Sequence, residues 1–205
     1  MKNFYLFGKG ELAIYCAERF ITKFEKSNLT VIPTIPEPDW TSSLLEWSNA
    51  KNVKVLKFTE IENIYIEDDA IGISIYFDKI FKNNIIQKFQ RLFNIHNSPL
   101  PKYRGVNPVN WALRNNENYH GVTLHLIDDG IDTGPIGDQI LFDINQKMEV
   151  IDVYNMCIES GKKLIDKNLE YLNSIECRQQ DENFASYYSK NDFINLGERK
   201  YFTRN

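Results

Sequence analysis

The stretch LFNIHNSPLPKYRG, Leu92 to Gly105, ends an apolar run with an amide, an imidazole and two prolines. The apolar run predicts a strand, and in a strand residues two apart share a face. Asn94 and His96 therefore point to the same side, at the carboxyl end of the strand, where open α/β sheets place their ligand crevice. Pro99 and Pro101 stiffen the loop that follows. The sequence thus predicts that an amide and an imidazole face a cleft together.

Strand-like and helix-like segments alternate on both sides of this stretch. AIGISIY, Ala70 to Tyr76, is continuously apolar, which is typical of a central strand covered on both faces. The segment 121–127 alternates like a half-buried strand. The alternation predicts an α/β domain over residues 1–175 and a short, irregular C-terminal extension over residues 176–205. Expected strands are 4–7, 29–35, 53–58, 70–76, 91–96, 121–127 and 136–142, and expected helices are 11–26, 40–49, 83–89, 109–114 and 150–172.

Composition excludes several classes of protein. The chain has 205 residues, 42% of them hydrophobic, which suits one globular domain. Its net charge of −4 gives no basic face, so we expect no nucleic-acid partner. No apolar run is long enough to cross a membrane. The three cysteines have no C-x-x-C spacing, which indicates reduced thiols in a cytoplasmic protein and no metal site.

A glycine loop follows the first expected strand. FGKGELA fits the pattern G-x-G-x-x-A, so Gly8, Lys9 and Gly10 could hold a phosphate at a helix N-terminus. The same pattern also fits a tight turn that any strand–helix unit needs. Glu11 beside the helix start would repel a phosphate, and the acidic residue that a ribose requires about 20 positions later is absent. An NAD-dependent oxidoreductase is therefore only an alternative interpretation.

A carboxylate in a later loop could complete a site with Asn94 and His96. In LIDDGIDTGPI, Leu126 to Ile136, Asp132 lies between Ile131 and a turn, so we expect it to point inward. A buried carboxylate beside His96 would fix the tautomer of the imidazole. An asparagine can donate to the oxygen of an acyl-transfer intermediate, and a histidine can move the proton of an amine. The alternative is that both residues satisfy backbone groups of the loop.

The combination NIHNSPLPKYRGVNPVNWAL…HGVTLHLIDDGIDTGPI resembles the folate-dependent formyltransferases, densely from Ala70 to Phe142. The resemblance implies a Rossmann-like domain with a mostly parallel central sheet flanked by helices. It implies N10-formyltetrahydrofolate as co-substrate, without a metal. Asn97 stands where the family pattern usually has proline. By motif, Asn94 stabilises the oxyanion, His96 transfers protons and Asp132 orients His96. The pterin is expected against Phe77, Asp78, Lys79, Ile80, Phe81, Asp128 and Asp129.

Within this family, PLPKYRGVNPVNWA and the later ASYYSKNDF, Ala185 to Phe193, resemble the branch that formylates nucleotide-linked amino sugars. We therefore expect a dTDP-linked 4-amino-4,6-dideoxyhexose as acceptor, in O-antigen or lipopolysaccharide synthesis, and a homodimer. The methionyl-tRNA enzymes carry a C-terminal barrel for which the last thirty residues are too few. Glycinamide ribonucleotide formyltransferase is the alternative, although its first loop resembles G-x-G-S-N. The residues expected to bind the sugar substrate are Gly8, Lys9, Gly10, Ser98, Lys102, Tyr103, Arg104 and Tyr187.

Several residues outside the expected trio have two interpretations. Lys102 to Arg104 could steer a diphosphate or form a solvated loop edge. Tyr187 and Tyr188 could flank a nucleotide ring or pack against the domain. We expect Trp111 in the core, His125 as a structural residue of its strand and His120 exposed.

Overall fold

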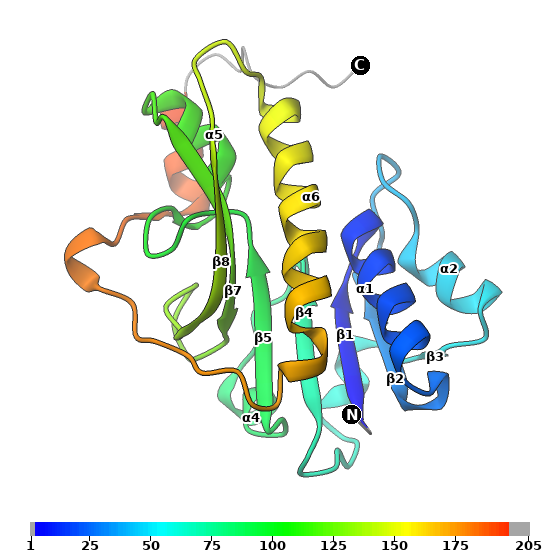
Figure 1. Cartoon of the computed structure of the whole chain (residues 1–205). Coiled ribbons are helices and arrows are strands. Elements are labelled where there is room, and N and C mark those ends of the chain that lie inside the picture. The colour runs from blue at the N-terminus through cyan, green and yellow to red at the C-terminus, as the bar shows by residue number, and fades with distance from the viewer. Residues whose placement is uncertain (1–2, 197–205) are drawn as a thin grey trace.

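The protein is built around one large sheet of seven strands, as the computed structural model shows (Figure 1). The structure describes residues 3–196, in which the strand order is β3-β2-β1-β4-β5-β7-β8. The strands from β3 to β5 in this order run parallel, and β7 and β8 are antiparallel to their neighbours. The predicted mostly parallel α/β sheet is confirmed. Its strands are β1 (Phe4–Gly8), β2 (Leu29–Pro33), β3 (Lys54–Val55), β4 (Ile71–Ile75), β5 (Arg91–His96), β7 (Tyr119–Leu126) and β8 (Ile136–Asp143).

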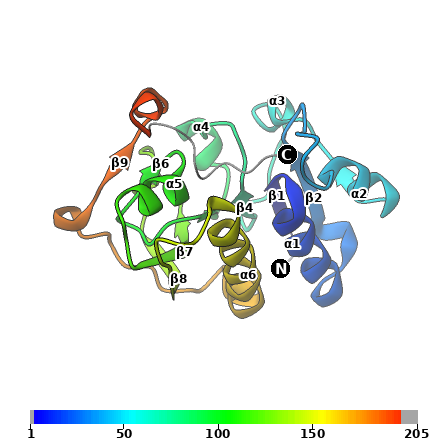
Figure 2. The same ribbon diagram turned by 90° about the horizontal axis from the view of Figure 1, so that it is seen from above.

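Helices cover both faces of this sheet, as Figure 2 shows from above. The long helices α1 (Gly10–Lys23) and α6 (Val150–Asn168) pack against one another on one face, and the short helices α3 (Phe58–Ile61) and α4 (Asn83–Ile86) lie on the other. β1, β2 and β4 are buried along their whole length, as expected of covered parallel strands. In the part of the chain that the structure describes, no helix has both the length and the apolar character to cross a membrane.

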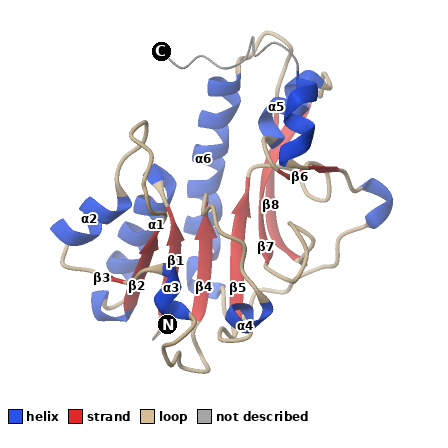
Figure 3. Cartoon of the chain, turned by 180° about the vertical axis from the view of Figure 1, so that it is seen from behind, coloured by secondary structure: helices blue, strands red, loops and turns tan. Residues whose placement is uncertain are grey.

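The parallel strands all finish at the same end of the sheet (Figure 3). The backbone is closely packed or strained where the chain leaves β1 and β4. Gly8 ends β1 so close to β4 that an added Cβ would lie 2.3 Å from the carbonyl oxygen of Ile75. Tyr76, directly after β4, has a φ of 56°, in the left-handed region that side chains rarely adopt. Because β1, β4 and β5 run parallel, the loops that follow these three strands lie at the same end of the sheet.

The C-terminal segment returns along the sheet and pairs with the loop after β5. Ile136 at the start of β8 forms an isolated antiparallel bridge with Arg178. Further along, β9 (Tyr187–Tyr188) pairs in parallel with β6 (Arg104–Gly105), close to the start of α5 (Pro108–Arg114). The described part of the predicted extension is therefore attached to the domain through β6, and residues 197–205 of it lie outside the described residues.

Several element boundaries differ from the prediction, among them those of one strand and two helices. The strand expected at 53–58 is only Lys54–Val55, and Phe58 already begins α3. The helix expected at 40–49 begins later, as α2 (Leu44–Ala50), because the Ser43 side chain accepts a hydrogen bond from the Glu46 N–H and caps it there. The helix expected to reach 172 ends at Asn168 and continues as a 3₁₀ turn, Leu169–Tyr171.

β7 was predicted to be half-buried, and this is wrong. Nearly all of its residues are buried, because α6 contacts it and the loop after β5 closes over it. Thr123 in β7 contacts that loop directly: its Oγ1 accepts from the Leu100 N–H and donates to the Ser98 carbonyl. His120 was expected to be exposed but is fully buried, with its Nε2–H donating to the Asn97 carbonyl at 2.8 Å.

Candidate active site

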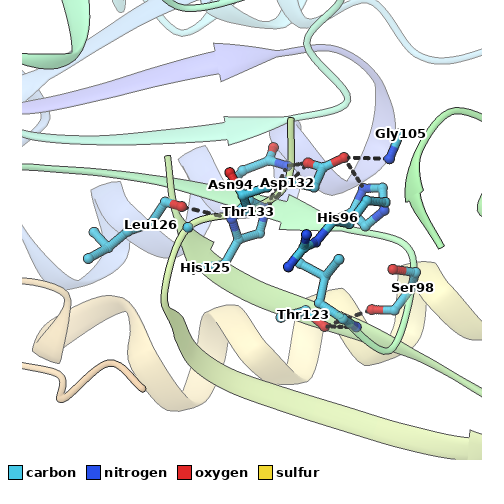
Figure 4. Close-up of polar contacts among 12 residues, drawn as sticks. Asn94, His96, Ser98, Gly105, Thr123, His125, Leu126, Asp132 and Thr133 are labelled. Atoms are coloured by element: carbon cyan, nitrogen blue, oxygen red, sulfur yellow. Dashed lines mark hydrogen bonds and ion pairs between the residues drawn. The ribbon is translucent and has the colours of Figure 1, made fainter. Parts of the chain in front are cut away.

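Asn94, His96 and Asp132 lie together although they come from two distant segments (Figure 4). The Asp132 Oδ2 atom lies 3.6 Å from His96 Nδ1, and Asp132 Oδ1 lies 3.4 Å from Asn94 Nδ2. The side chain of Asp132 is only 14% exposed, so the carboxylate points inward as expected. Asn94 and His96 are brought to this point by β5, which ends at His96. The structure therefore joins the amide, the imidazole and the carboxylate that the motifs single out.

The carboxylate of Asp132 is held by several donors. The Gly105 N–H donates to Oδ2 at 2.9 Å. Burial alone would raise the pKa of Asp132, but the charge of His96, the hydrogen bond and charge of His125 and the Gly105 N–H lower that pKa well below its ordinary value. The backbone of Asp132 has a φ of 55°, an unfavourable conformation for a residue with a side chain. Asp132 is thus ionised at neutral pH and fixed in place.

The hydrogen bond of the His96 ring identifies which nitrogen is available for proton transfer. Nε2 lies 2.9 Å from the Tyr103 carbonyl oxygen, which can only accept, so Nε2 carries a proton. The other ring nitrogen, Nδ1, faces Asp132. A proton that Nδ1 takes up is therefore stabilised by the carboxylate, and Nδ1 is the atom of His96 suited to exchange protons.

His125 belongs to the same cluster, which the sequence reasoning missed. Its Nε2 lies 3.2 Å from Asn94 Nδ2 and 3.5 Å from Asp132 Oδ1, and its Nδ1–H donates to the Leu126 carbonyl. The register of the antiparallel pair β5 and β7 places His125 directly opposite Asn94. Strand alternation alone does not reveal which residue of a neighbouring strand lies opposite another, so no signal in a single sequence would have found this contact.

A buried amide from the C-terminal segment supports the Asp132 loop, and the sequence reasoning missed it too. The Gln180 Nε2 group donates to the carbonyls of Asp132 and Gly134, each at 2.8 Å. Its Oε1 accepts from the Arg104 Nε and Nη2 atoms at 3.1 and 2.8 Å. Because Arg104 precedes Gly105, one side chain ties the backbone of Asp132 to the segment that donates to its carboxylate.

A cavity of about 600 Å³, which we name the first cavity, opens beside this cluster. Asn94, His125 and Asp132 line it, together with Tyr187 of β9. All five residues expected to face the pterin after β4 also line it, as does one of the two expected aspartates: Phe77, Asp78, Lys79, Ile80, Phe81 and Asp128. Asp129, the other aspartate, is exposed and is not among the lining residues. The first cavity thus has a mainly apolar wall next to the charged cluster.

The second cavity, of about 770 Å³, shares Phe77 and Val106 with the first. It begins at the N-terminal ends of α1 and α6, where Lys9 and Ile151 line it. The remaining lining residues are Glu11, Trp40, Thr41, Tyr76, Asn97, Asn107, Pro108, Val109, Asn110, Val150, Tyr154, Asn155 and Ile158. The two cavities therefore meet at Phe77 and Val106, beside the cluster around Asp132.

The glycine loop contributes to the second cavity only through Lys9. Gly8 packs against the backbone of β4, and Gly10, with a φ of 76°, lies against Thr41. Both glycines thus have the packing role of a tight strand–helix turn, and not that of a phosphate loop. The charge of Glu11 is balanced by Lys162, whose Nζ lies 2.6 Å from its Oε1.

Four residues that were expected to bind substrate make contacts within the protein. Ser98 is fully buried, and its hydroxyl donates to the Lys102 carbonyl. Lys102 Nζ and the Tyr103 hydroxyl both contact Glu117 Oε1, at 3.3 and 2.7 Å. Arg104 is 6% exposed, with its guanidinium on Gln180 and Glu182, so it is not on a solvated loop edge. Because its guanidinium is already paired with Gln180 and Glu182, Arg104 has no free charge for a substrate.

The C-terminal tyrosines differ from one another. Tyr188 stacks on Trp111 with ring centroids 4.1 Å apart and on Tyr103 at 5.8 Å, so it packs against the domain. Trp111 is buried, as expected. Tyr187 is 55% exposed and lines the first cavity. Among the described residues, no group of three or more His, Cys, Asp or Glu side chains is arranged to hold a metal ion.

The chain matches one family model and resembles solved structures of formyltransferases. The family model described as formyl transferase matches residues 23–169. An N-formyltransferase from Helicobacter canadensis, solved with folinic acid and dTDP-3-aminofucose, is 35% identical with a TM-score of 0.85, over 94% of this chain and 72% of that one. WlaRD, a sugar 3N-formyl transferase solved with dTDP and 5-N-formyl-THF, is also 35% identical with a TM-score of 0.85, over 94% of this chain and 71% of that one.

A curated relative matches over a shorter segment. The methionyl-tRNA formyltransferase of Pseudothermotoga lettingae is 36% identical over 121 residues, which is 58% of this chain. This chain spans only 40% of the length of that relative.

Proposed function

The chain belongs to the formyl transferase family, and on this premise we propose that it transfers the formyl group of N10-formyltetrahydrofolate to the amine of a nucleotide-linked amino sugar. The observation that carries the proposal is the meeting of two cavities beside Asn94, His96 and Asp132. A transferase with two small-molecule substrates needs such an arrangement, because the donor and the acceptor must be held with their reacting atoms in contact.

The first cavity suits the folate. Its volume of about 600 Å³ lies in the usual range for small-molecule sites. Ile80, Ile127 and Ile131 give it apolar surface for a flat ring, and Asp128 and Asp132 belong to the loop that the family motif assigns to the pterin. Two similar structures, at 35% identity, were solved with folinic acid or 5-N-formyl-THF, which supports a reduced folate as the donor here.

The second cavity suits a nucleotide sugar. Lys9 supplies a cation for a diphosphate, while Trp40 and Tyr154 offer aromatic surface and several asparagines offer hydrogen bonds. The two structures at 35% identity carry dTDP-3-aminofucose or dTDP, which favours a dTDP-linked amino sugar. These relatives favour an amine at C3 of the sugar, whereas the sequence motifs predict a 4-amino sugar, so both acceptors belong in the test.

The chemistry follows from the positions of the side chains. The folate supplies an activated formyl carbon; a bond forms from the acceptor nitrogen to this carbon, and the bond from the carbon to N10 breaks. Asn94 lines the first cavity, and its long contact to Asp132, 3.4 Å, can be exchanged for a hydrogen bond to the formyl oxygen as that oxygen gains charge. His96 Nδ1 holds the proton that the amine loses, beside the Asp132 carboxylate, before N10 receives a proton.

The acceptor is identified by incubating the protein with N10-formyltetrahydrofolate and a panel of amines, followed by mass spectrometry of the products. The panel contains dTDP-linked 3-amino and 4-amino dideoxyhexoses, their UDP-linked counterparts and glycinamide ribonucleotide. We expect formylation of one or more of the sugars. Formylation of glycinamide ribonucleotide alone would refute the proposal.

We also propose a role in the synthesis of surface polysaccharides such as O-antigen, in the cytoplasm, and a homodimeric state. Light scattering on the purified protein measures the oligomer directly, and a monomer at all concentrations would remove the dimer from the proposal.

A further inference from the structure

The second cavity is lined by four asparagine residues. Asn97, Asn107, Asn110 and Asn155 all line it, while Lys9 is its one lining cation within residues 3–196. Asn97 and Asn110 are each only 8% exposed. Amide groups that line an open cavity and are not engaged by other side chains are available to a ligand that enters it.

Asn97 is held from two sides by other residues. Its Oδ1 accepts from the Tyr76 hydroxyl at 3.0 Å, and its backbone carbonyl accepts from His120 Nε2 at 2.8 Å. Tyr76 is itself placed by its φ of 56° and by contact with the Tyr154 ring, whose centroid lies 5.8 Å away. With Oδ1 bound, the two N–H donors of Asn97 Nδ2 are left, and over residues 3–196 they have no hydrogen-bond partner.

Asn110 repeats this situation on α5. Its side chain makes no hydrogen bond to any described residue, although the residue is nearly buried and lines the same cavity. Asn97 and Asn110 thus bring two available amides to one cavity, and a sugar ring carries several oxygen atoms that amide N–H groups can bind.

The position of Asn97 relates it to the reacting atoms. It directly follows His96, and the cavity that it lines joins the first cavity at Phe77 and Val106. An acceptor that lies in the second cavity and extends its amine towards Asn94 and His96 would bring its sugar ring past Asn97. On a hexose, the neighbour of an amine-bearing carbon commonly carries a hydroxyl, whose oxygen accepts a hydrogen bond.

We propose that Asn97 is a specificity-determining residue, which donates an Nδ2–H to the hydroxyl oxygen next to the amine that is formylated. Tyr76 is its positioning residue, and Asn110 contacts the same sugar. This inference rests on the proposed function. It also gives a role to the asparagine that stands where the family pattern usually has proline, since proline has no side-chain donor.

Initial rates with an amino sugar that the protein accepts, and with its analogue lacking the adjacent hydroxyl, test the proposal. The variants are Asn97→Leu, which removes the amide, and Asn97→Asp, which keeps the shape but cannot donate when ionised. Asn63→Leu, at an exposed position that lines neither cavity, is the matched control. Folate-induced thermal stabilisation checks that each variant is folded and that the first cavity is intact.

We expect Asn97→Leu and Asn97→Asp to raise the KM for the amino sugar about tenfold, as for loss of one hydrogen bond from a buried site. The KM for the folate should change less than about twofold, because Asn97 does not line the first cavity. The unsubstituted protein should lose about tenfold in kcat/KM with the deoxy analogue, whereas the two variants should lose nothing more.

Two outcomes distinguish failure of this inference from failure of the proposed function. If the unsubstituted protein formylates amino sugars but the deoxy analogue is penalised equally in the protein and in both variants, Asn97 does not contact that hydroxyl. If the unsubstituted protein formylates no amino sugar, the proposed function fails and the inference fails with it. Tyr76→Phe is expected to give a smaller rise in KM than Asn97→Leu, and an unchanged KM in all three variants overturns the whole arrangement.

Discussion

Gln180 donates its side-chain amide to the backbone carbonyl of Asp132 at 2.8 Å, although 48 positions separate the two residues along the chain. The contact comes from the C-terminal segment after α6, which pairs with the domain at β6 and β9. It supports a residue with φ at 55°, which the local chain alone would not favour. The position of the carboxylate therefore depends on a segment far from it in sequence.

Replacing Gln180 tests this dependence. In Gln180→Met, a side chain of similar length remains but the carbonyls of Asp132 and Gly134 lose their donor. We expect kcat to fall about tenfold or more, because a small displacement of a catalytic group has a large effect on rate. Both KM values should change less than about twofold, since neither cavity is lined by Gln180.

The control for this prediction is Gln179→Met at the exposed neighbouring position. Equal losses of kcat in the two variants, or a kcat in Gln180→Met that matches the unsubstituted protein, would show that Gln180 does not position Asp132.

Asn94 and His96 are expected to affect turnover, not only binding. Asn94→Ala removes the donor for the formyl oxygen, and His96→Ala removes the group that exchanges a proton beside Asp132. We expect each variant to lower kcat at least about a hundredfold. Single-turnover rates with both substrates saturating provide the measurement, and near-normal rates in both variants would remove these residues from the mechanism.

The periodicity of the sequence was sufficient to predict β5 and the side-by-side display of Asn94 and His96. Both follow from local rules: a strand has a period of two residues, and parallel strands carry their ligands at the carboxyl ends. The inward direction of Asp132 could be predicted from its place between Ile131 and the turn that follows. The α/β alternation likewise gave the sheet, because each buried strand is continuously apolar.

Contacts across the fold could not be predicted in this way. His125 meets Asn94 because of the register of β5 and β7, and Gln180 meets Asp132 because of a long return of the chain. Arg104 was expected to bind the substrate or to lie on a solvated loop edge, yet its guanidinium is buried on Gln180 and Glu182. Such pairings depend on tertiary packing, for which residue type and local spacing carry no signal.

His120 should make the folded state sensitive to mild acid. Burial lowers its pKa from 6.5 to about 4, against a weaker opposing effect of its hydrogen bond to Asn97. The unfolded chain therefore binds a proton between these values that the folded protein does not, so stability is full above pH 6.5 and falls as the pH drops towards 4. The loss is on the order of 3 kcal/mol over this window.

Urea unfolding at pH 7 and pH 4.5 measures this loss. In His120→Gln, which keeps a donor but cannot take up a proton, we expect a smaller decrease in the free energy of unfolding between the two pH values, even if the variant is less stable at pH 7. The same decrease in the variant and in the unsubstituted protein would show that other groups cause the acid sensitivity.

Gly105 is expected to link the C-terminal segment to catalysis. Its φ is 91°, and an added Cβ would lie 2.2 Å from the Tyr188 carbonyl oxygen, so Gly105→Ala must separate β6 from β9. The Gly105 N–H also donates to Asp132 Oδ2 at 2.9 Å. We expect kcat to fall about tenfold or more and the free energy of unfolding to fall by about 1–3 kcal/mol, because both the strand pairing and the donor are disturbed.

Tyr188→Phe is the control, since it keeps the stack on Trp111 and loses only the hydroxyl contact with Asn115. A Gly105→Ala variant with normal kcat would mean that the β6–β9 pairing and the carboxylate of Asp132 are independent of one another.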